Sequence, residues 1–520
     1  MVEPRRTDRP EVARLKVDRS GDGDSDRIAV IGGGVAGLAV ALGVLDAARR
    51  QGRDVRVTVF EAGAEPGGNL RTLHRDGWRL EWGPNGFLDS EPATLRLVER
   101  LGLKDDLLRS SDVTRHRFLL LGGRLREIPT SPPAFLGSKV LSPGGKLRVL
   151  AEPLIPRRRG LDGDPADGGD ETVAEFGRRR LGREFTEVLL DPMVKGIFGG
   201  SARRLSLAAA FPRMVELERT YGGLFRAMFA LGRERRRQRR RTDGGGDATA
   251  RSGGAGGPSG TLHSFTGGMA VLIQALVREV TATGAGEVRT GAPVTRLTSG
   301  DDGWRVAGEG FQAGPFGVVV DAAPAHAAAG HLRESAPEIS LELQAIPFAP
   351  MAVVALGFDA GAVRHDLQGF GLLVPGREGR DLLGSLWTSS IFAGRAPAGR
   401  VLLRNMLGGA DNAAVMDLDD EALVNLTLAE LRPVLGLQGP PAMTRVIRHR
   451  RAIAQYEVGH PARLRRVDEA LRARPGLILT GSSYRGISVN NCVKEAETVS
   501  VAALDALPAR ARPAAGKAAR

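Results

Sequence analysis

The feature that most constrains the fold of this 520-residue chain is a glycine-rich turn near its start, Gly32–Gly37. An apolar strand predicted over Ile28–Ile31 leads into the turn, and an alanine- and leucine-rich helix predicted over Val35–Arg50 follows it. A second strand over Val55–Phe60 ends beside Glu61 and completes a βαβ unit. In such a unit the three glycines permit a tight turn, a close approach of backbone to a pyrophosphate, and close helix–strand packing. The sequence therefore predicts a dinucleotide-binding site.

The predicted dinucleotide contacts continue beyond this turn. Free N–H groups at the helix start can receive phosphates, and the Glu61 carboxylate can accept hydrogen bonds from a ribose hydroxyl. A second glycine pair, Gly67-Gly68, permits another close backbone approach, and Arg71 adds a cation beside the anionic cofactor. The predicted contacts of this unit are Gly32, Gly33, Gly34, Val35, Ala36, Gly37, Glu61, Gly68, Asn69 and Arg71.

Composition excludes several other chemistries. The one cysteine, Cys492, can form neither an intramolecular disulfide nor a zinc cluster, and it favours a reducing compartment. The eight histidines show no metal-ligand spacing, so no metal site is predicted. The first 27 residues lack the apolar core of a signal peptide. The apolar run over Ile28–Leu45 is broken by glycines, which favours a buried strand–turn–helix over a membrane span.

Further motifs follow one another in order over residues 28–507. They are EWGPNGF at Glu81–Phe87, HRF at His116–Phe118, GRL at Gly123–Leu125, a block over Phe176–Phe211, SSIFAGRAP at Ser389–Pro397 and GSSYRGISVNNC at Gly481–Cys492. Together they resemble the motifs of protoporphyrinogen oxidases, flavoproteins of the large family that includes amine oxidases and phytoene desaturases. Two positions depart from the pattern, because Asn69 stands where some relatives carry Trp and Asn85 where some carry Arg.

The resemblance implies noncovalent FAD as the cofactor and a set of further site residues. The flavin would take hydride from the substrate, so no catalytic side chain is implied. The implied additional FAD contacts are Gly83, Pro84, Asn85, Gly86, Val294, Ser482, Ile487, Ser488 and Val489. The implied substrate contacts are Arg117, whose guanidinium would hold a propionate, Phe392 and Leu373, which would flank pyrrole rings, and Gly199 and Gly200, whose backbone would face the macrocycle.

The expected architecture is α/β. A discontinuous, Rossmann-like FAD-binding domain is joined by a mixed-sheet substrate domain and a mostly helical lobe that docks on a membrane. The expected segments are a disordered leader (1–26), the FAD-binding domain (27–94, 262–325 and 436–510), the helical lobe (95–228), a disordered Arg- and Gly-rich loop (229–261), the substrate-binding domain (326–435) and a disordered tail (511–520).

The charge of the chain is concentrated in one place. The formal net charge is +13, and Arg233–Arg241 holds seven arginines and one glutamate. Such a run is consistent with a solvated loop, with contact to anionic lipid, or with nucleic-acid binding. No nucleic-acid-binding motif accompanies it, so nucleic acid is not expected as a partner. We expect a cytoplasmic protein attached peripherally to the anionic inner face of the cell membrane.

The resemblance to protoporphyrinogen oxidases implies the oxidation of protoporphyrinogen IX to protoporphyrin IX in haem biosynthesis. FAD would accept hydride, and oxygen would reoxidise the flavin and yield hydrogen peroxide. Coproporphyrinogen III oxidation on the same scaffold is a close alternative, which would need a pocket for four propionates. An amine or carotenoid oxidoreductase is a more distant one, and a lipid- or nucleic-acid-binding protein that retains a flavin fold is a different class. A homodimer is left open.

Overall fold

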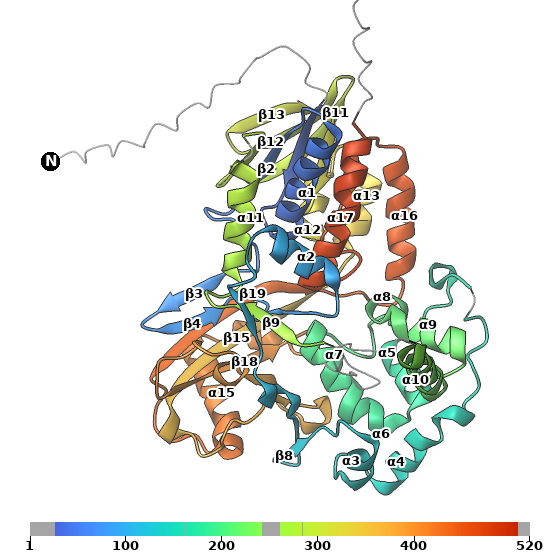
Figure 1. The fold of residues 1–520 in the computed structure, drawn as a ribbon, viewed down its shortest axis with the longest axis vertical. Helices are drawn as coiled ribbons and strands as arrows, with labels where there is room; N and C mark the ends of the chain where they lie inside the picture. Colours follow the sequence, from blue (N-terminus) through green and yellow to red (C-terminus); the bar gives the residue numbers. More distant parts are fainter. Residues whose placement is uncertain (1–25, 162, 242–259, 283, 508–520) are drawn as a thin grey trace, which may run out of the picture.

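The computed structural model describes residues 26–161, 163–241, 260–282 and 284–507. The molecule is elongated, with a layered α/β unit at one end, a second large sheet at the other and a group of helices beside that sheet (Figure 1). The predicted α/β fold class with a Rossmann-like unit is confirmed. Except for Asp26, the expected leader and tail lie outside the described residues.

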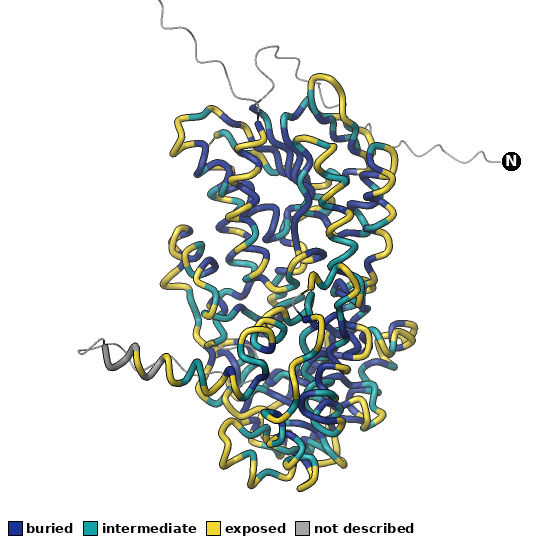
Figure 2. Tube along the Cα trace, turned by 90° about the vertical axis from the view of Figure 1, so that its right-hand side faces the viewer, coloured by how far each residue is buried: buried dark blue, intermediate teal, exposed yellow. Residues whose placement is uncertain are grey.

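The layered unit is built on a five-stranded parallel sheet. Its strands, in spatial order, are β10 (Gly286–Arg289), β2 (Arg56–Phe60), β1 (Arg27–Ile31), β14 (Val318–Asp321) and β20 (Leu477–Leu479). Strands β1, β2, β14 and β20 are short, mainly apolar runs because a parallel sheet is covered on both faces, whereas the edge strand β10 exposes Glu287 and Arg289. Figure 2 shows this end of the molecule with its central strands buried.

Helices and a small sheet cover the two faces of the parallel sheet. Helix α1 packs against α11 and α17 on one face, and a three-stranded antiparallel sheet with helices α12 and α13 covers the other. The bounds are α1 (Val35–Gln51), α11 (Ala270–Ala282), α17 (Val489–Asp505), β11 (Val294–Gly300), β12 (Gly303–Gly308), β13 (Phe311–Phe316), α12 (Ala325–His331), α13 (Pro337–Gln344) and α16 (His460–Arg472).

The second large sheet has seven strands. Their spatial order is β19 (Met443–Ala454), β15 (Phe348–Asp359), β18 (Arg400–Gly408), β17 (Leu382–Trp387), β16 (Gly371–Leu373), β7 (Arg117–Leu121) and β8 (Arg124–Glu127). Helix α15 (Asp420–Leu435) packs on one face. The opposite face packs against the hairpin of β3 (Thr72–Arg75) and β4 (Trp78–Glu81) and against helix α7 (Asp191–Phe198).

Three strands of the seven-stranded sheet come from segments that the sequence assigned to other domains. Strands β7 and β8 come from segment 95–228, which was expected to be part of the helical lobe, and β19 comes from segment 436–510, which was expected in the FAD-binding domain. All three belong to the seven-stranded sheet. Hydrogen-bonded neighbours in a sheet are set by tertiary contacts that leave little trace in local sequence.

The remaining helices form the lobe beside the second sheet (Figure 1). They are α3 (Pro132–Gly137), α4 (Pro143–Leu150), α5 (Val173–Arg180), α6 (Arg183–Phe185), α8 (Leu207–Ala210), α9 (Pro212–Tyr221) and α10 (Leu224–Arg241). Between this lobe and the layered unit lie α2 (Pro92–Arg100) and a small sheet of β5 (Phe87–Leu88), β9 (Leu262–Phe265) and β6 (Leu107–Arg109). None of the helices built from described residues is long and apolar enough to cross a bilayer.

The expectation of disorder from residue 229 is wrong for its first part. Helix α10 continues through the arginine run to Arg241. Arginine is a good helix former, and the first turns of the helix anchor it, with Leu224 and Ala227 buried against the lobe. Residues 242–259 lie outside the described residues.

A pair of glycine substitutions tests the packing that the turn requires. A Cβ added at Gly37 would collide with the carbonyl oxygen of Gly32 and lie 3.2 Å from Val30 Cγ1. We expect Gly37→Ala to destabilise the fold by about 1–3 kcal/mol and to lower the thermal midpoint. Gly330→Ala is the control, because a Cβ on this residue of α12 meets no atom within 4 Å, and it should be neutral or stabilise by up to about 1 kcal/mol. Equal midpoints for the two variants would contradict the packing argument.

Candidate cofactor and substrate site

The predicted glycine turn leaves the first turn of α1 open. Gly32 adopts a φ of +102°, a backbone conformation that favours glycine, and its N–H donates to Phe60 O at 2.8 Å. Gly34 is the N-cap residue of α1, and no side chain caps the helix there. A Cβ added at Gly34 would meet no atom within 4 Å. The N-terminus of a long buried helix thus faces free space, which is the arrangement that binds phosphate.

Glu61 holds two turns in place. Its Oε2 accepts a hydrogen bond from Gly33 N at 2.7 Å, and its Oε1 accepts one from Gly63 N at 2.7 Å. The main chain of Glu61 is tied to β10 and to the segment that follows it, since Glu61 N donates to Arg289 O at 2.8 Å and Ala292 N donates to Glu61 O at 2.9 Å. Each carboxylate oxygen keeps further acceptor capacity, so acceptance from a ribose hydroxyl remains a prediction compatible with these bonds.

The second glycine pair lies directly against the first turn. Gly67 N donates to Gly33 O at 2.8 Å, and a Cβ added at Gly68 would lie 3.5 Å from Gly34 Cα. Arg71 follows, with its guanidinium carbon 5.9 Å from the centre of the Trp82 ring and its buried Nε without a hydrogen-bond partner among the described residues. Two backbone turns and a cation therefore face one space.

The segment Gly83–Gly86 borders the same space. A Cβ added at Gly83 would lie 3.1 Å from Asn69 Cβ, which puts this segment next to the second glycine turn. Asn85 is 9 % exposed, and neither polar atom of its side-chain amide has a partner among the described residues. Buried amides are normally hydrogen-bonded, so this orphaned group indicates that a polar ligand completes the site.

The C-terminal motif meets the first turn from the other side. A Cβ added at Gly481 would lie 3.9 Å from Ala36 Cβ, and Ser482 O accepts a hydrogen bond from the Tyr456 hydroxyl at 2.8 Å. Ser488 caps α17, its hydroxyl accepting from Asn491 N at 3.1 Å. Helix α17 starts at Val489, and Asn490 Nδ2 donates to Leu88 O at 2.9 Å, just beyond the Gly83–Gly86 segment. The structure thus joins residues more than 400 positions apart in the sequence.

Two of the sequence-predicted cofactor residues lie at the edge of this group. Val294 is buried at the start of β11, two residues after Ala292, which binds Glu61. Ile487 is partly buried in the turn that precedes α17. The residues predicted for the cofactor therefore surround one region at the carboxyl ends of β1 and β2, where open α/β sheets place their ligands.

The predicted substrate residues lie elsewhere, on the second sheet. Arg117 pairs with Gly371, and Leu119 pairs with Leu373, so Arg117 and Leu373 share one face of the sheet. Arg117 is exposed as a whole residue, but partial burial of its guanidinium lowers the pKa of that group, whose carbon lies 5.2 Å from the centre of the Phe370 ring. Leu373 is half-buried, and a Cβ added at Gly196 of α7 would lie 2.8 Å from its Cδ2. Helix α7 therefore covers this face next to Leu373.

Gly199, Gly200 and Phe392 are all buried in this structure. Gly199 ends α7 in the left-handed conformation, and a Cβ there would lie 2.8 Å from Met351 Cε on the same sheet face. Gly200 follows it and is buried against Gln455. Phe392 is only 1 % exposed, with its ring centre 5.4 Å from the Arg395 guanidinium. In this structure Phe392 lies in the core beneath the site, so a direct contact with substrate remains a prediction.

Several charged residues near the site were not predicted from the sequence. Glu81 forms a buried ion pair with Arg395 at 3.2 Å, and Arg404 donates from Nη2 to Gly83 O at 2.8 Å. His449 Nε2 lies 3.0 Å from Trp82 O, and burial lowers its pKa, which keeps the imidazole neutral. Glu81 and Arg395 belong to quoted motifs, which offered a signal. Arg404 and His449 carried none, because single charged residues inside strands are common.

Neither a metal nor a covalent flavin link is suggested by the described part of the chain. No group of three or more His, Cys, Asp and Glu side chains there could hold a metal ion. Cys492 is buried on α17, and desolvation raises the pKa of its thiol to about 12. A protonated, buried thiol is a poor nucleophile, which agrees with the expectation that the flavin is not covalently bound.

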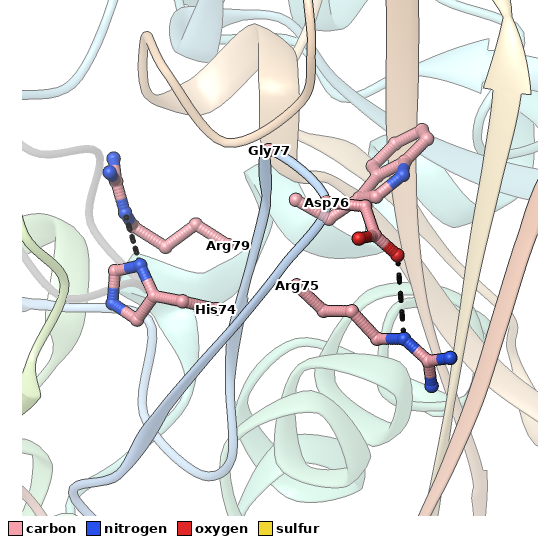
Figure 3. A pocket seen from close by; sticks show the side chains of 6 residues that line it. His74, Arg75, Asp76, Gly77 and Arg79 are labelled. Carbon is pink, nitrogen blue, oxygen red and sulfur yellow. Dashed lines mark hydrogen bonds and ion pairs between the residues drawn. The ribbon is translucent and has the colours of Figure 1, made fainter.

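A small hollow at the tip of the β3–β4 hairpin is separate from this site. It has a volume of about 220 Å³ and is lined by residues 74–79 of the hairpin itself (Figure 3). Arg75 pairs with Asp76 at 3.5 Å, and Arg79 Nε lies 3.4 Å from His74 Nδ1. None of the predicted site residues lines it, and we assign it no role.

Comparison with known proteins defines the class to which this fold and site belong. The sequence pattern of the family described as flavin containing amine oxidoreductase matches residues 35–504, and the chain belongs to that family. Its FAD cofactor, expected from the motifs, is thereby confirmed. The orphaned Asn85 amide, the open space at Gly34 and the unpaired Arg71 Nε fit a large polar ligand with phosphates.

Individual relatives narrow the class to enzymes of the protoporphyrinogen oxidase type. The chain is 29% identical to the coproporphyrinogen III oxidase of Bacillus subtilis (strain 168), over 90% of this chain and 96% of that protein. It is 32% identical to the chloroplastic protoporphyrinogen oxidase of Oryza sativa subsp. japonica, over 90% and 86%. A crystal structure of an Exiguobacterium protein, provisionally assigned as a protoporphyrinogen oxidase, matches with a TM-score of 0.74 and 25% identity, over 92% and 99%. The resemblance drawn from the motifs is confirmed.

Substitution of Gly34 tests the placement of the cofactor. Because a Cβ at Gly34 meets only open space, Gly34→Val should fold with a nearly unchanged thermal midpoint without added FAD. The valine would fill the space that phosphate needs, so the purified variant should be colourless or should bind FAD at least tenfold more weakly by titration of flavin fluorescence. A yellow variant with full FAD content would contradict this placement. Gly37→Ala, in contrast, should lower both stability and FAD content.

Proposed function

We propose that the protein oxidises a porphyrinogen to the corresponding porphyrin, with hydride passing to FAD and electrons returning to oxygen as hydrogen peroxide. The observation that carries this proposal is that Arg117 and the apolar Leu373 share one face of the second sheet. The same sheet contacts the cofactor loop through the hydrogen bond from Arg404 to Gly83 O. A guanidinium can grip a propionate through two parallel hydrogen bonds, and apolar side chains suit a tetrapyrrole. The names of the relatives from Bacillus and rice support the same reaction class.

The protein's own part in this reaction is to bind and orient the substrate. FAD supplies the hydride-accepting chemistry when bound. Arg117 fixes one edge of the macrocycle, and Leu373 with the neighbouring apolar side chains keeps water from the ring. The backbone of Gly199 and Gly200, at the end of α7, would border the ring where a side chain would not fit.

Two substrates fit this proposal. Protoporphyrinogen IX is the first candidate, because the quoted motifs resemble those of protoporphyrinogen oxidases. Coproporphyrinogen III is the second, because the Bacillus relative carries that name and because a further arginine, Arg404, lies on the same sheet face. Oxidation of an amine or a carotenoid instead of a porphyrinogen, which the next experiment also tests, would contradict the proposal.

The purified protein, yellow from its flavin, is mixed in air with each porphyrinogen in turn. We expect porphyrin fluorescence to rise and hydrogen peroxide to accumulate with it, both measured above the slow uncatalysed oxidation. Benzylamine and a carotenoid precursor serve as comparison substrates. Bleaching of the flavin by one of these, with no acceleration of porphyrin formation, would defeat the proposal.

Replacing Arg117 separates anchoring of the substrate from chemistry. Arg117→Ala should raise KM about tenfold or more and change kcat much less, because a charge-assisted bond made equally in the ground and transition states is lost. Arg115→Ala is the matched control, since Arg115 is exposed nearby and paired with Asp112 at 3.1 Å. Equal losses in kcat and kcat/KM would instead place Arg117 at the transition state.

We also propose that the helical lobe docks on an anionic membrane surface. Exposed apolar side chains cluster on α3, α4, the short 3₁₀ turn Glu152–Leu154 that follows α4, and α10, which contacts that turn. These side chains are Leu136, Leu147, Leu150, Leu154, Met228 and Phe229. Figure 1 shows α3 and α4 together at one end of the molecule. With the exposed Arg233 and Arg237 of α10, they form an apolar and basic surface of the kind that binds lipid headgroups and acyl chains.

Vesicle binding tests this surface. The double substitution Leu147→Glu and Leu154→Glu should weaken cosedimentation with anionic vesicles at least tenfold, because burial of each leucine contributes about 1.5–3 kcal/mol. The control is Leu341→Glu on α13, which is 67% exposed on the layered unit. If wild-type protein cosediments with neither anionic nor neutral vesicles at low salt, the proposal is contradicted.

A further inference from the structure

Arg404 is an arginine deep in the molecule with few partners. It lies on β18, and Nη2 donates to Gly83 O at 2.8 Å. Among the described residues its buried Nε has no hydrogen-bond partner. Burial lowers the pKa of this guanidinium to about 10, which leaves it charged at neutral pH. The side chain nevertheless keeps some accessible surface. Burying a charged group is costly unless a group of opposite charge lies beside it, so an anion is expected next to Arg404.

The nearest carboxylate does not supply that anion. Glu81 already pairs with Arg395 at 3.2 Å, and it accepts hydrogen bonds from Thr72 Oγ1 at 2.8 Å and from Met269 N at 3.1 Å. Desolvation raises the pKa of Glu81 in spite of these partners. One carboxylate thus faces two arginines, and one positive charge is in excess beside the cofactor loop.

Strand register places Arg404 in line with Arg117. Arg117 on β7 pairs with Gly371 on β16, Gly371 pairs with Leu386 on β17, and Leu386 pairs with Arg404 on β18. Paired residues in adjacent strands point to the same face of a sheet, so both arginines belong to one face. Three strand spacings separate their Cα atoms by about 14 Å. This separation is comparable to the breadth of a tetrapyrrole with its side arms.

The residues between the two arginines on this sheet face are apolar or glycine. Gly371 contributes no side chain, and Leu386 is half-buried. The next row of the same face holds Leu373 and Met406. A macrocycle lying here would meet a cation at each of two opposite edges and apolar atoms beneath its centre.

We propose that Arg404 is a second carboxylate anchor, opposite Arg117, and that the preferred substrate is a porphyrinogen with carboxylate arms on both edges of the ring. This inference rests on the proposed function and selects within it. Coproporphyrinogen III carries such arms on all four rings, whereas the corresponding edge of protoporphyrinogen IX carries vinyl groups. A vinyl group would leave the guanidinium without an anion, which disfavours protoporphyrinogen IX.

The test compares both porphyrinogens in wild type and Arg404→Gln, each as the FAD-loaded enzyme. We expect wild type to oxidise coproporphyrinogen III with the higher kcat/KM. Arg404→Gln should lower this value about tenfold or more, mainly through KM, and should change the value for protoporphyrinogen IX by less than about twofold. Arg117→Gln should weaken both substrates, since both carry propionates at that edge.

Two further variants control for folding and for charge. Arg400→Gln lies on the same strand, at its exposed start, and Arg400 pairs with Asp359 at 3.1 Å, so this variant should leave both substrates unaffected. Arg404→Lys keeps the cation but loses the planar fork, and should give an intermediate loss for coproporphyrinogen III only. If Arg404→Gln fails to retain FAD, the lysine variant carries the comparison.

The outcomes that overturn the proposal are distinct. Equal loss for both substrates together with a shifted flavin spectrum would assign Arg404 to the cofactor. A wild-type preference for protoporphyrinogen IX would also overturn it. If wild type is yellow yet oxidises neither porphyrinogen, the proposed function fails. The role of Arg404 as a carboxylate anchor is then tested separately, by measuring the binding of the two porphyrin products. Coproporphyrin III should then bind more tightly than protoporphyrin IX, and Arg404→Gln should remove the difference.

Discussion

The close contact between two glycine turns is the constraint on which the rest of the site depends. Gly67 N reaches Gly33 O at 2.8 Å, and Glu61 accepts from the backbone of both Gly33 and Gly63. These bonds can form only where the turns carry no side chains in the way. They fix the start of α1, the segment after β2 and the loop that ends in Arg71 as one rigid cradle. FAD binding by this family member follows from that cradle.

One loop connects the cofactor cradle with the second sheet, where the substrate is proposed to bind. The segment Gly83–Gly86 leaves the β3–β4 hairpin, borders the cofactor space and accepts a hydrogen bond from Arg404 of β18. The hairpin itself packs on the same sheet face, through Trp78 and Leu80. The loop Gly83–Gly86 and the sheet face proposed for the substrate are therefore parts of a single packed unit, so a shift in either would displace the other. This arrangement fits the proposal that the protein binds and orients its substrate while the flavin supplies the chemistry.

Positive charge is concentrated in two parts of the molecule, near the candidate site and on the helical lobe. Close to the site, Glu81 pairs with Arg395 and lies near Arg404, so one positive charge is in excess on the sheet face proposed for the substrate. On the helical lobe, the exposed Arg233 and Arg237 lie on α10, the helix that contacts the turn carrying the exposed Leu154. The first arrangement suits a carboxylated small molecule, because the charge is buried and geometrically fixed. The second suits an extended anionic surface, because its apolar side chains are exposed in a group.

The sequence alone determined the βαβ unit and its nucleotide site, because these depend on glycines and apolar runs at fixed short spacing. The type of flavoenzyme followed from the resemblance of its motifs to those of a known family. The sequence also placed Arg117 and Leu373 in separate segments without showing that they share a sheet face. Only the tertiary structure decided that β7, β8 and β19 join one sheet, and that the arginine run continues a helix rather than a loop. Arg404 became visible as a site residue for the same reason. Strand register and the neutralisation of buried charge are set between distant segments, and no local pattern records them.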